Sequence, residues 1–254
     1  MKKLFAVLLA LALMLSAVSA MADTLTIATS PDFPPFEYID PAAGEAPVGI
    51  EIDILNLICE KLGMELQIEQ MDFEAVLPGV KAGKFDLGVS GISVTDERKK
   101  NALFTDPYCL AAQAIVVVEG SPITSKADLD GKKISVQTGT TAETFCMKNF
   151  YDVSPFAANA DAELALVNGK VDAWVIDDLT AADMVKVYNA EHDVKLVILD
   201  DAMTTEPYAF AMAKGQEELQ SKLNEALHEL LDAGTIQEIF AKYEAPYTAP
   251  EAAE

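Results

Sequence analysis

The sequence predicts an α/β protein with two lobes, each a mostly parallel sheet flanked by helices. Strand-like and helix-like segments alternate along the chain after residue 22, and this alternation favours parallel sheets with helices on their faces. A short motif recurs in the two halves. The C-terminal part resembles the first half in its alternation, which suggests that the chain returns to the first lobe.

The first lobe begins with clear periodic segments. Apolar periodicity separates helices from strands, and a glycine that follows a periodic segment is typical of a helix end. The elements expected here are a strand at 24–29, a helix at 49–63 closed by Gly63, a strand at 64–70, a helix at 73–83 and a strand at 85–93.

The second lobe repeats this alternation from about residue 115. The expected elements are a strand at 132–137, a helix at 141–150, a helix that ends at Gly169, a strand at 171–177 and a helix at 179–190. AGKFDLGVSG (82–91) and NGKVDAWVID (168–177) both run small residue, Gly, Lys, apolar residue, Asp and then a strand. A match this short also arises by chance, but it favours two lobes of similar construction.

The final segments predict where the lobes join. The stretch at 206–215 followed by helix-like 216–243 returns the chain to the first lobe, with crossings near 110–116 and 200–206 that would form a hinge. We therefore predict four parts: a leader at 1–22, lobe 1 at 23–112 and 204–246, lobe 2 at 113–203, and a Pro- and Ala-rich disordered tail at 247–254.

The first 22 residues predict export. Two lysines precede an apolar run of twelve residues, and Ala20 and Ala22 form an A-x-A cleavage site, as in a secretory signal peptide. The run is short for a membrane span, and no second run of this kind follows. We expect a free periplasmic protein.

Charge and composition exclude several functions. Residues 23–254 carry 16 basic and 41 acidic side chains, a net charge of −25, which repels nucleic acid and anionic membranes. Three distant cysteines form no disulfide framework, and Cys59 is expected to be a buried free thiol. Two histidines supply neither a metal cluster nor a Ser-His-Asp triad. The calcium-loop-like DLDGKK (128–133) lacks the later ligands.

Ligand-binding residues are expected at the carboxyl ends of strands, where helices begin. The candidate loops are 29–36, 90–98 and 138–143, with the strand end at 176–178. In the second loop Thr95 caps a short helix that carries Arg98, the single arginine among 17 lysines. Arginine binds a carboxylate through a planar fork, but a solvated turn is an equally good interpretation from this loop alone.

The other candidates have structural alternatives. Prolines stiffen the loop around Phe33, which lines either a cleft or the core, and the same choice applies to Phe73. Thr140 or Thr141 caps a helix whose free N–H groups favour an anion. Asp177 either caps a helix or faces the cleft, where its carboxylate pairs with an ammonium group.

Six blocks of sequence, taken in their order along the chain, resemble one family. Together with the leader, they are similar to the periplasmic solute-binding proteins of polar amino-acid ABC importers, bacterial extracellular solute-binding protein family 3. The most specific stretch is ISVTDERKK at 92–100. The blocks are IATSPDFPPFEY, VGIEIDILNLICEKLGMELQIEQMDF, GKFDLGVSGISVTDERKK, FTDPYCLAAQAIVV, SKADLDGKKISVQTGTTAE and KVDAWVIDD.

The resemblance implies a type II periplasmic binding protein-like fold, two lobes joined by two hinge strands that close over one amino acid. It implies a monomer that delivers its ligand to an ABC permease, without cofactor or metal. It assigns Arg98, Ser93 and the helix start at Thr141 to the ligand carboxylate. The ammonium group is assigned to Asp177 with a backbone oxygen of Ser90 or Gly91, and the ligand side chain to Phe33 and Phe73.

The sequence leaves two classes of ligand side chain open, cationic and uncharged polar. Ser30 stands where family members that bind lysine or arginine often carry aspartate, and Gln137 occupies a position that varies with substrate. Asp32 and Asp178 keep a cationic side chain open, but an amide or other uncharged polar side chain is slightly favoured.

Two other functions remain open. One is a small-acid dehydratase on the same fold, for which Glu143 or Asp178 are the available acid or base groups. The other is a ligand sensor. Such a module is normally followed by a membrane span, and since this chain ends at Glu254, a sensory role is expected to need a separate membrane receptor.

Overall fold

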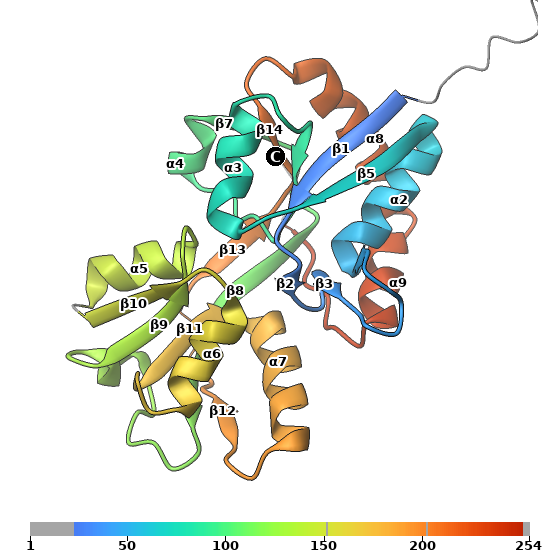
Figure 1. Ribbon diagram of the computed structural model, residues 1–254. Coiled ribbons are helices and arrows are strands. Elements are labelled where there is room, and N and C mark those ends of the chain that lie inside the picture. Colours follow the sequence, from blue (N-terminus) through green and yellow to red (C-terminus); the bar gives the residue numbers. More distant parts are fainter. Residues whose placement is uncertain (1–22, 151, 202, 251–254) are drawn as a thin grey trace, which may run out of the picture.

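The computed structural model describes residues 23–150, 152–201 and 203–250, and it shows two sheet-centred bodies (Figure 1). The first contains a five-stranded sheet of order β5-β1-β6-β14-β7. Its strands are β5 (Met64–Gln70), β1 (Asp23–Thr29), β6 (Leu87–Gly88), β14 (Ala211–Ala213) and β7 (Ala102–Phe104), and its helices are α2 (Ile50–Leu62), α3 (Phe73–Lys81), α4 (Asp96–Lys99), α8 (Glu217–Asp232) and α9 (Thr235–Lys242).

The second body contains a sheet of order β10-β9-β11-β8-β12. Its strands are β10 (Asp152–Phe156), β9 (Lys133–Gln137), β11 (Ala173–Asp177), β8 (Cys109–Val118) and β12 (Leu196–Ile198), and its helices are η1 (Lys126–Leu129), α5 (Thr141–Asn149), α6 (Asn159–Val167) and α7 (Asp178–Glu191).

Two strands connect the bodies. β13 (Thr205–Tyr208) pairs antiparallel with the first half of β8, with Thr205 opposite Ala112 and Tyr208 opposite Cys109. Both strands run between the two bodies in Figure 1, at the two places where the sequence predicts crossings. The fold is therefore two-lobed with two hinge strands. The lobe boundaries at 112/113 and 203/204 stay a prediction.

The short sequence repeat corresponds to a structural repeat. Gly83 and Gly169 both follow a helix with positive φ, 69° and 66°. Asp86 accepts a hydrogen bond from the Thr26 N–H at 2.8 Å, and Asp172 accepts one from the Lys133 N–H at 2.9 Å. Each aspartate thus joins its strand to the preceding parallel strand in the same way, which supports two lobes of similar construction.

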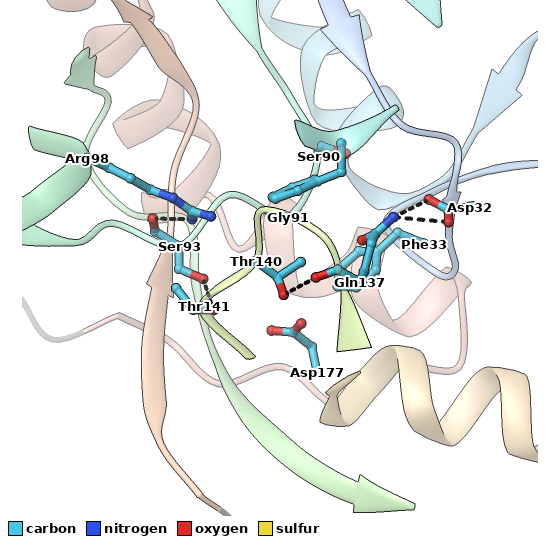
Figure 2. Close-up of a pocket in the computed structure, with 11 residues that line it drawn as sticks. Asp32, Phe33, Ser90, Gly91, Ser93, Arg98, Gln137, Thr140, Thr141 and Asp177 are labelled. Carbon is cyan, nitrogen blue, oxygen red and sulfur yellow. Dashed lines mark hydrogen bonds between the residues drawn. The ribbon is translucent and has the colours of Figure 1, made fainter. Parts of the chain in front are cut away.

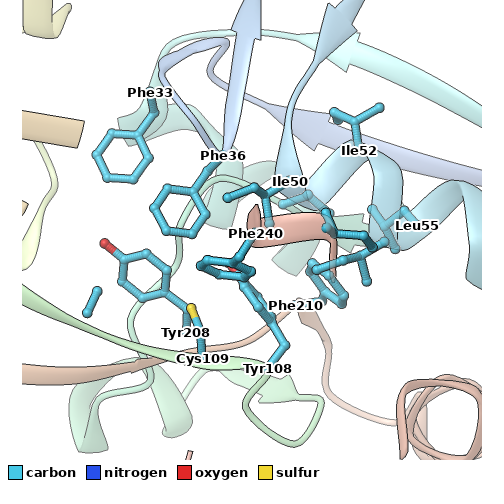
Figure 3. Packing of buried hydrophobic residues seen from close by; sticks show 14 of the residues in the cluster. Phe33, Phe36, Ile50, Ile52, Leu55, Tyr108, Cys109, Tyr208, Phe210 and Phe240 are labelled. Atoms are coloured by element: carbon cyan, nitrogen blue, oxygen red, sulfur yellow. The ribbon is translucent and has the colours of Figure 1, made fainter. Parts of the chain in front are cut away.

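Aromatic side chains form a buried cluster in the first lobe (Figure 3). The buried ring of Phe36 packs against Phe33, Tyr208 and Phe240, with centroid distances of 5.6, 5.2 and 6.0 Å. Burying one such ring stabilises the fold by about 1.5–3 kcal/mol. This packing fixes the rings of Phe33 and Tyr208.

The sheets are less parallel than predicted. β14 runs antiparallel to β6 and β7, and β8 runs antiparallel to β11. β14 follows directly after the hinge strand β13, and β8 is itself a hinge strand, so the chain enters each sheet from the other lobe. The proline-rich loop also differs from the prediction: it forms a small antiparallel sheet of β2 (Asp32–Phe33), β3 (Glu37–Ile39) and β4 (Pro47–Val48).

Two corrections concern the C-terminal part. The helix-like stretch 216–243 is two helices, because Gly234 adopts a left-handed conformation with φ 76° between α8 and α9. The expected disordered tail is wrong for Tyr247 and Thr248. Tyr247 donates to the Tyr108 carbonyl oxygen at 3.2 Å, and the Leu110 N–H donates to the Thr248 carbonyl oxygen at 2.9 Å. Residues 251–254 lie outside the described residues.

The predicted leader at 1–22 also lies outside the described residues. Within the described ranges, no helix combines the length and apolar character required to cross a membrane. All three cysteines are buried and free, so the expected buried thiol at Cys59 is confirmed.

Candidate functional site

A pocket between the lobes brings together residues from loops far apart in the sequence. Nine of the ten predicted site residues line it, and Ser30 does not. The lining consists of Asp32, Phe33, Phe73, Ser90, Gly91, Ser93, Arg98, Gln137, Thr140, Thr141 and Asp177.

Arg98 lies at one end of this pocket (Figure 2). It belongs to α4, whose N-cap Thr95 accepts a hydrogen bond from the Arg98 N–H at 3.1 Å. The guanidinium donates through Nη1 to the Ser93 carbonyl oxygen at 2.9 Å and through Nη2 to the Gly139 carbonyl oxygen at 3.2 Å. It also lies 5.7 Å from the ring centroid of Phe73. Its remaining N–H groups can bind an anion.

Asp177 lies at the end of β11 and is 7% exposed. Its carboxylate accepts hydrogen bonds from Gln113 Nε2 at 2.9 Å and from the Tyr208 hydroxyl. Burial, with the negative charge of Glu206 as the next contribution, raises the pKa of Asp177 to about 7. A carboxylate that is buried without a cation is favourably neutralised by a ligand ammonium group.

The start of α5 supplies neutral donors near Arg98. Thr140 is the N-cap and accepts from the Glu143 N–H at 3.1 Å, so Thr141 is the first helical residue. The first N–H groups of a helix lack partners inside the helix and favour an anion. The Ser93 and Thr141 hydroxyl oxygens lie 3.5 Å apart, across the cleft.

Gly91 brings the backbone close to the pocket. Its φ of 53° is a left-handed conformation, and an added Cβ would lie 2.5 Å from Cε1 of Phe33. Only glycine therefore fits here without displacing Phe33. The neighbouring Ser90 accepts at its hydroxyl from the Ser30 N–H at 3.1 Å.

Asp32 and Gln137 lie at the other end of the pocket from Arg98 (Figure 2). Gln137 Nε2 donates to both Asp32 oxygens at 3.3 and 3.2 Å, and the Asn159 N–H donates to Asp32 Oδ2 at 2.8 Å. The Ser30 hydroxyl donates to Asp32 Oδ1 at 3.0 Å. Burial raises the pKa of Asp32. The structure thus places Ser30 behind Asp32 rather than in the lining.

Sequence reasoning missed several polar residues of the site. Glu206, 9% exposed, accepts from the Thr141 hydroxyl at 2.7 Å and the Thr204 hydroxyl at 2.9 Å. Burial lowers the pKa of Arg98, and the negative charge of the nearby Glu206 opposes this shift; the same charge adds to the burial that raises the pKa of Asp177. Gln113 and Tyr208 were also missed. All three lie on β8 or β13, and the only available signal was the expectation of a hinge there.

The two residues considered for acid-base chemistry do not line the pocket. Asp178 accepts from the Ala112 N–H at 3.2 Å and from the Leu179 N–H at 2.9 Å. Glu143 accepts from the Gly139 N–H at 2.6 Å. Both carboxylates therefore hold backbone N–H groups. Among the described residues, no group of three or more His, Cys, Asp or Glu side chains is arranged to hold a metal ion.

The comparisons with known proteins agree with this geometry. The family model described as bacterial extracellular solute-binding proteins, family 3, matches residues 25–246. The L-arginine-binding protein of Pseudomonas aeruginosa is 32% identical, with 96% of each chain covered.

Solved structures are similar over most of their length. An ancestral arginine-binding protein bound to glutamine is 38% identical, with a TM-score of 0.82, and the match covers 89% of this chain and 100% of that chain. The ancestral amino acid-binding protein AncCDT-1, a precursor of cyclohexadienyl dehydratase, is 32% identical with a TM-score of 0.79, covering 87% of this chain and 95% of that one.

Proposed function

Since the chain belongs to the bacterial extracellular solute-binding proteins, family 3, we propose that it captures one polar amino acid between its lobes for an ABC-type importer. One observation carries this proposal: Arg98 of lobe 1 and Asp177 of lobe 2 line the same pocket. A guanidinium and a buried carboxylate on opposite walls match the two charges of an amino-acid zwitterion.

The ligand carboxylate binds Arg98, the Ser93 hydroxyl and the free N–H groups at the start of α5. The ammonium group binds Asp177 and the Ser90 carbonyl oxygen. In this orientation the ligand side chain extends past Phe33 toward Asp32 and Gln137, at the far end of the pocket (Figure 2).

We infer that a cationic side chain fits best, which reverses the slight preference drawn from Ser30. Arg98 is the single cation among the described residues that line the pocket, whereas Asp32 and Asp177 line it and Glu206 adjoins it. A zwitterion adds no net charge, so a guanidinium or ammonium side chain beside Asp32 balances the excess of carboxylates. An amide is the second choice, since it also donates N–H groups to Asp32.

Ligand binding favours closure because the ligand touches both lobes. A ligand held by Arg98 on one side and Asp177 on the other binds the closed form better than the open one, and this difference shifts the hinge equilibrium. The closed protein then presents its ligand to a membrane permease. We propose a periplasmic monomer in this role.

We propose binding rather than turnover. The similarity to the dehydratase precursor keeps an enzyme as the second candidate, but neither Glu143 nor Asp178 lines the pocket. Ionisable groups near the ligand are instead used to hold its charges. Turnover of a prephenate-like acid by the purified protein would favour the enzyme.

A thermal-shift screen of residues 23–254 against the twenty amino acids tests the function. A ligand at 100 times its Kd stabilises the folded state by about 2.7 kcal/mol. We expect the largest shift with arginine or lysine, and calorimetry should give one site. If no amino acid raises the melting temperature, the proposed function is wrong.

A further inference from the structure

Two glutamates lie together beneath the pocket. Glu37 on β3 and Glu51 in the first turn of α2 both have 0% of their surface exposed. The two carboxyl groups lie close enough to change each other's pKa, and Glu37 Oε2 is buried without a hydrogen-bond partner among the described residues. Two neighbouring buried carboxylates are not both ionised, and a proton on Glu37 lets this otherwise unpaired oxygen act as a donor. Burial and the charge of Glu51 raise the pKa of Glu37 well above its usual value, and the proton therefore belongs to Glu37.

The pair is bonded to the loop that lines the pocket. Glu51 accepts from the Gly91 N–H at 3.0 Å and from the Tyr108 hydroxyl at 2.6 Å. The Ser90 hydroxyl donates to Glu37 Oε1 at 3.0 Å. Each glutamate therefore holds one of two consecutive residues whose other faces line the ligand space.

These contacts fix the direction of one peptide group. In a planar trans peptide, the carbonyl of Ser90 and the N–H of Gly91 point in opposite directions. Because the Gly91 N–H points toward Glu51, the Ser90 carbonyl oxygen points in the opposite direction, away from the glutamates. Among the described residues, no hydrogen bond ends on this oxygen. It is available to a ligand.

We propose that Glu37 and Glu51 are positioning residues of the amino-acid site: with one shared proton, they aim the Ser90 carbonyl oxygen at the ligand ammonium group. This inference rests on the proposed function, which supplies the ammonium group. The residues assigned to the ligand by family resemblance do not include either glutamate.

The surroundings of the pair keep it at a single negative charge. Tyr108 faces Glu51, and burial together with the Glu51 charge raises the pKa of Tyr108 well above its usual value, so it remains a donor. Cys109 is likewise kept neutral, since burial and then Glu51 raise its pKa. Asp32 is the other nearby acid, and its charge disfavours ionisation of Glu37.

Two substitutions of similar size distinguish the hydrogen bonds of a protonated Glu37 from its contribution to packing. Glu37→Gln keeps a neutral side chain that donates to Glu51 and accepts from Ser90. Glu37→Leu keeps the volume without either bond. For the amino acid that binds the wild type, we expect Glu37→Gln to keep the affinity within about twofold and Glu37→Leu to weaken it about tenfold, as for one lost hydrogen bond. Equal affinities for the two variants would overturn the proposal.

Infrared difference spectroscopy tests the proton without a ligand. At pH 8, above the pKa of about 7 of Asp177, the wild type should show the carbonyl stretch of a protonated carboxyl group that Glu37→Gln lacks. If no such band is lost, the proposal is wrong even if Glu37→Leu fails to fold. If the band is present but the wild type binds no amino acid, the proposed function fails while the shared proton stands.

Discussion

The Arg98 guanidinium donates a hydrogen bond across the cleft to the Gly139 carbonyl oxygen, at 3.2 Å. Arg98 lies on α4 of lobe 1, whereas Gly139 precedes α5 of lobe 2. The side chain assigned to the ligand carboxylate therefore also contacts the opposite lobe. In the proposed mechanism, binding and closure therefore use the same residue, and we expect opening of the cleft to break this hydrogen bond.

Replacing Arg98 tests the carboxylate anchor. Arg98→Ala should weaken amino-acid binding by roughly 2–5 kcal/mol, because a buried charge pair loses one partner. Arg98→Lys keeps the charge but loses the planar fork, and we expect about tenfold weaker binding. Calorimetry measures both. Lys99→Ala is the matched control, since Lys99 lies on the same helix with an exposed side chain. If Arg98→Ala binds as tightly as Lys99→Ala, the assignment is wrong.

Asp177 predicts how affinity depends on pH. Its pKa of about 7 in the ligand-free protein means that it is increasingly protonated below pH 7, and only the ionised form pairs with an ammonium group. Affinity should therefore fall as the pH drops below 7, approaching about tenfold per pH unit. Titration calorimetry between pH 5 and pH 8 measures this slope. A flat profile would remove Asp177 from the ammonium site.

The raised pKa of Asp177 also predicts that the stability of the ligand-free protein falls as the pH rises, whereas the affinity for the ligand rises. The pKa of Asp177 is raised on folding, so the folded state retains its proton between about pH 4 and pH 7 while the unfolded state loses it, and stability falls over this range. Asp177→Asn cannot ionise. Relative to the wild type, its ligand-free melting temperature should rise as the pH increases from 4 to 8, although ligand binding is lost. A constant difference would contradict the buried charge.

Asp32 tests the preference for a cationic side chain. Asp32→Asn should reduce affinity for arginine about tenfold and for glutamine less than about threefold, because only arginine loses a charge pair. Asp40→Asn removes a negative charge of the same hairpin, outside the pocket, and serves as the control. Equal losses for the two ligands would argue against contact between Asp32 and a cationic group.

The Asn159 N–H donates to Asp32 across the cleft, and it can be removed selectively. Asn159 is the first residue of α6, where proline fits, and Ala158 has the extended conformation that precedes proline. Asn159→Pro should bind ligand about fivefold more weakly than Asn159→Ala, which loses the same side chain but keeps the N–H. Small-angle scattering should show a more open ligand-free protein. Identical affinities would mean that this bond does not support closure.

Local sequence patterns predicted most of the regular structure. The strand 64–70 was predicted at its observed bounds, and α2 ends before Gly63, which has the expected left-handed conformation. The predictions were wrong where tertiary contacts determine the local structure. The loop around Phe33 forms a small sheet because β3 pairs with both β2 and β4. Tyr247 is ordered by the ring of Phe240 and the carbonyl of Tyr108.

The site was predictable where its residues lie in distinctive loops. Asp177 is the last residue of β11 and Arg98 lies on α4; both belong to motifs that the family resemblance also marks, and the structure brings both into the pocket. Glu206 was missed because it lies on a short hinge strand that carries no motif. The roles of Glu37 and Glu51 depend on a contact between β3 and α2, which no spacing in the sequence reveals.

A crystal structure of residues 23–254 with bound arginine tests the central claim most directly. The ligand carboxylate should accept hydrogen bonds from Arg98, and the ligand ammonium group should contact Asp177 and the Ser90 carbonyl oxygen, with the side chain directed toward Asp32. A ligand bound in the reverse orientation, or outside the pocket between the lobes, would contradict the account.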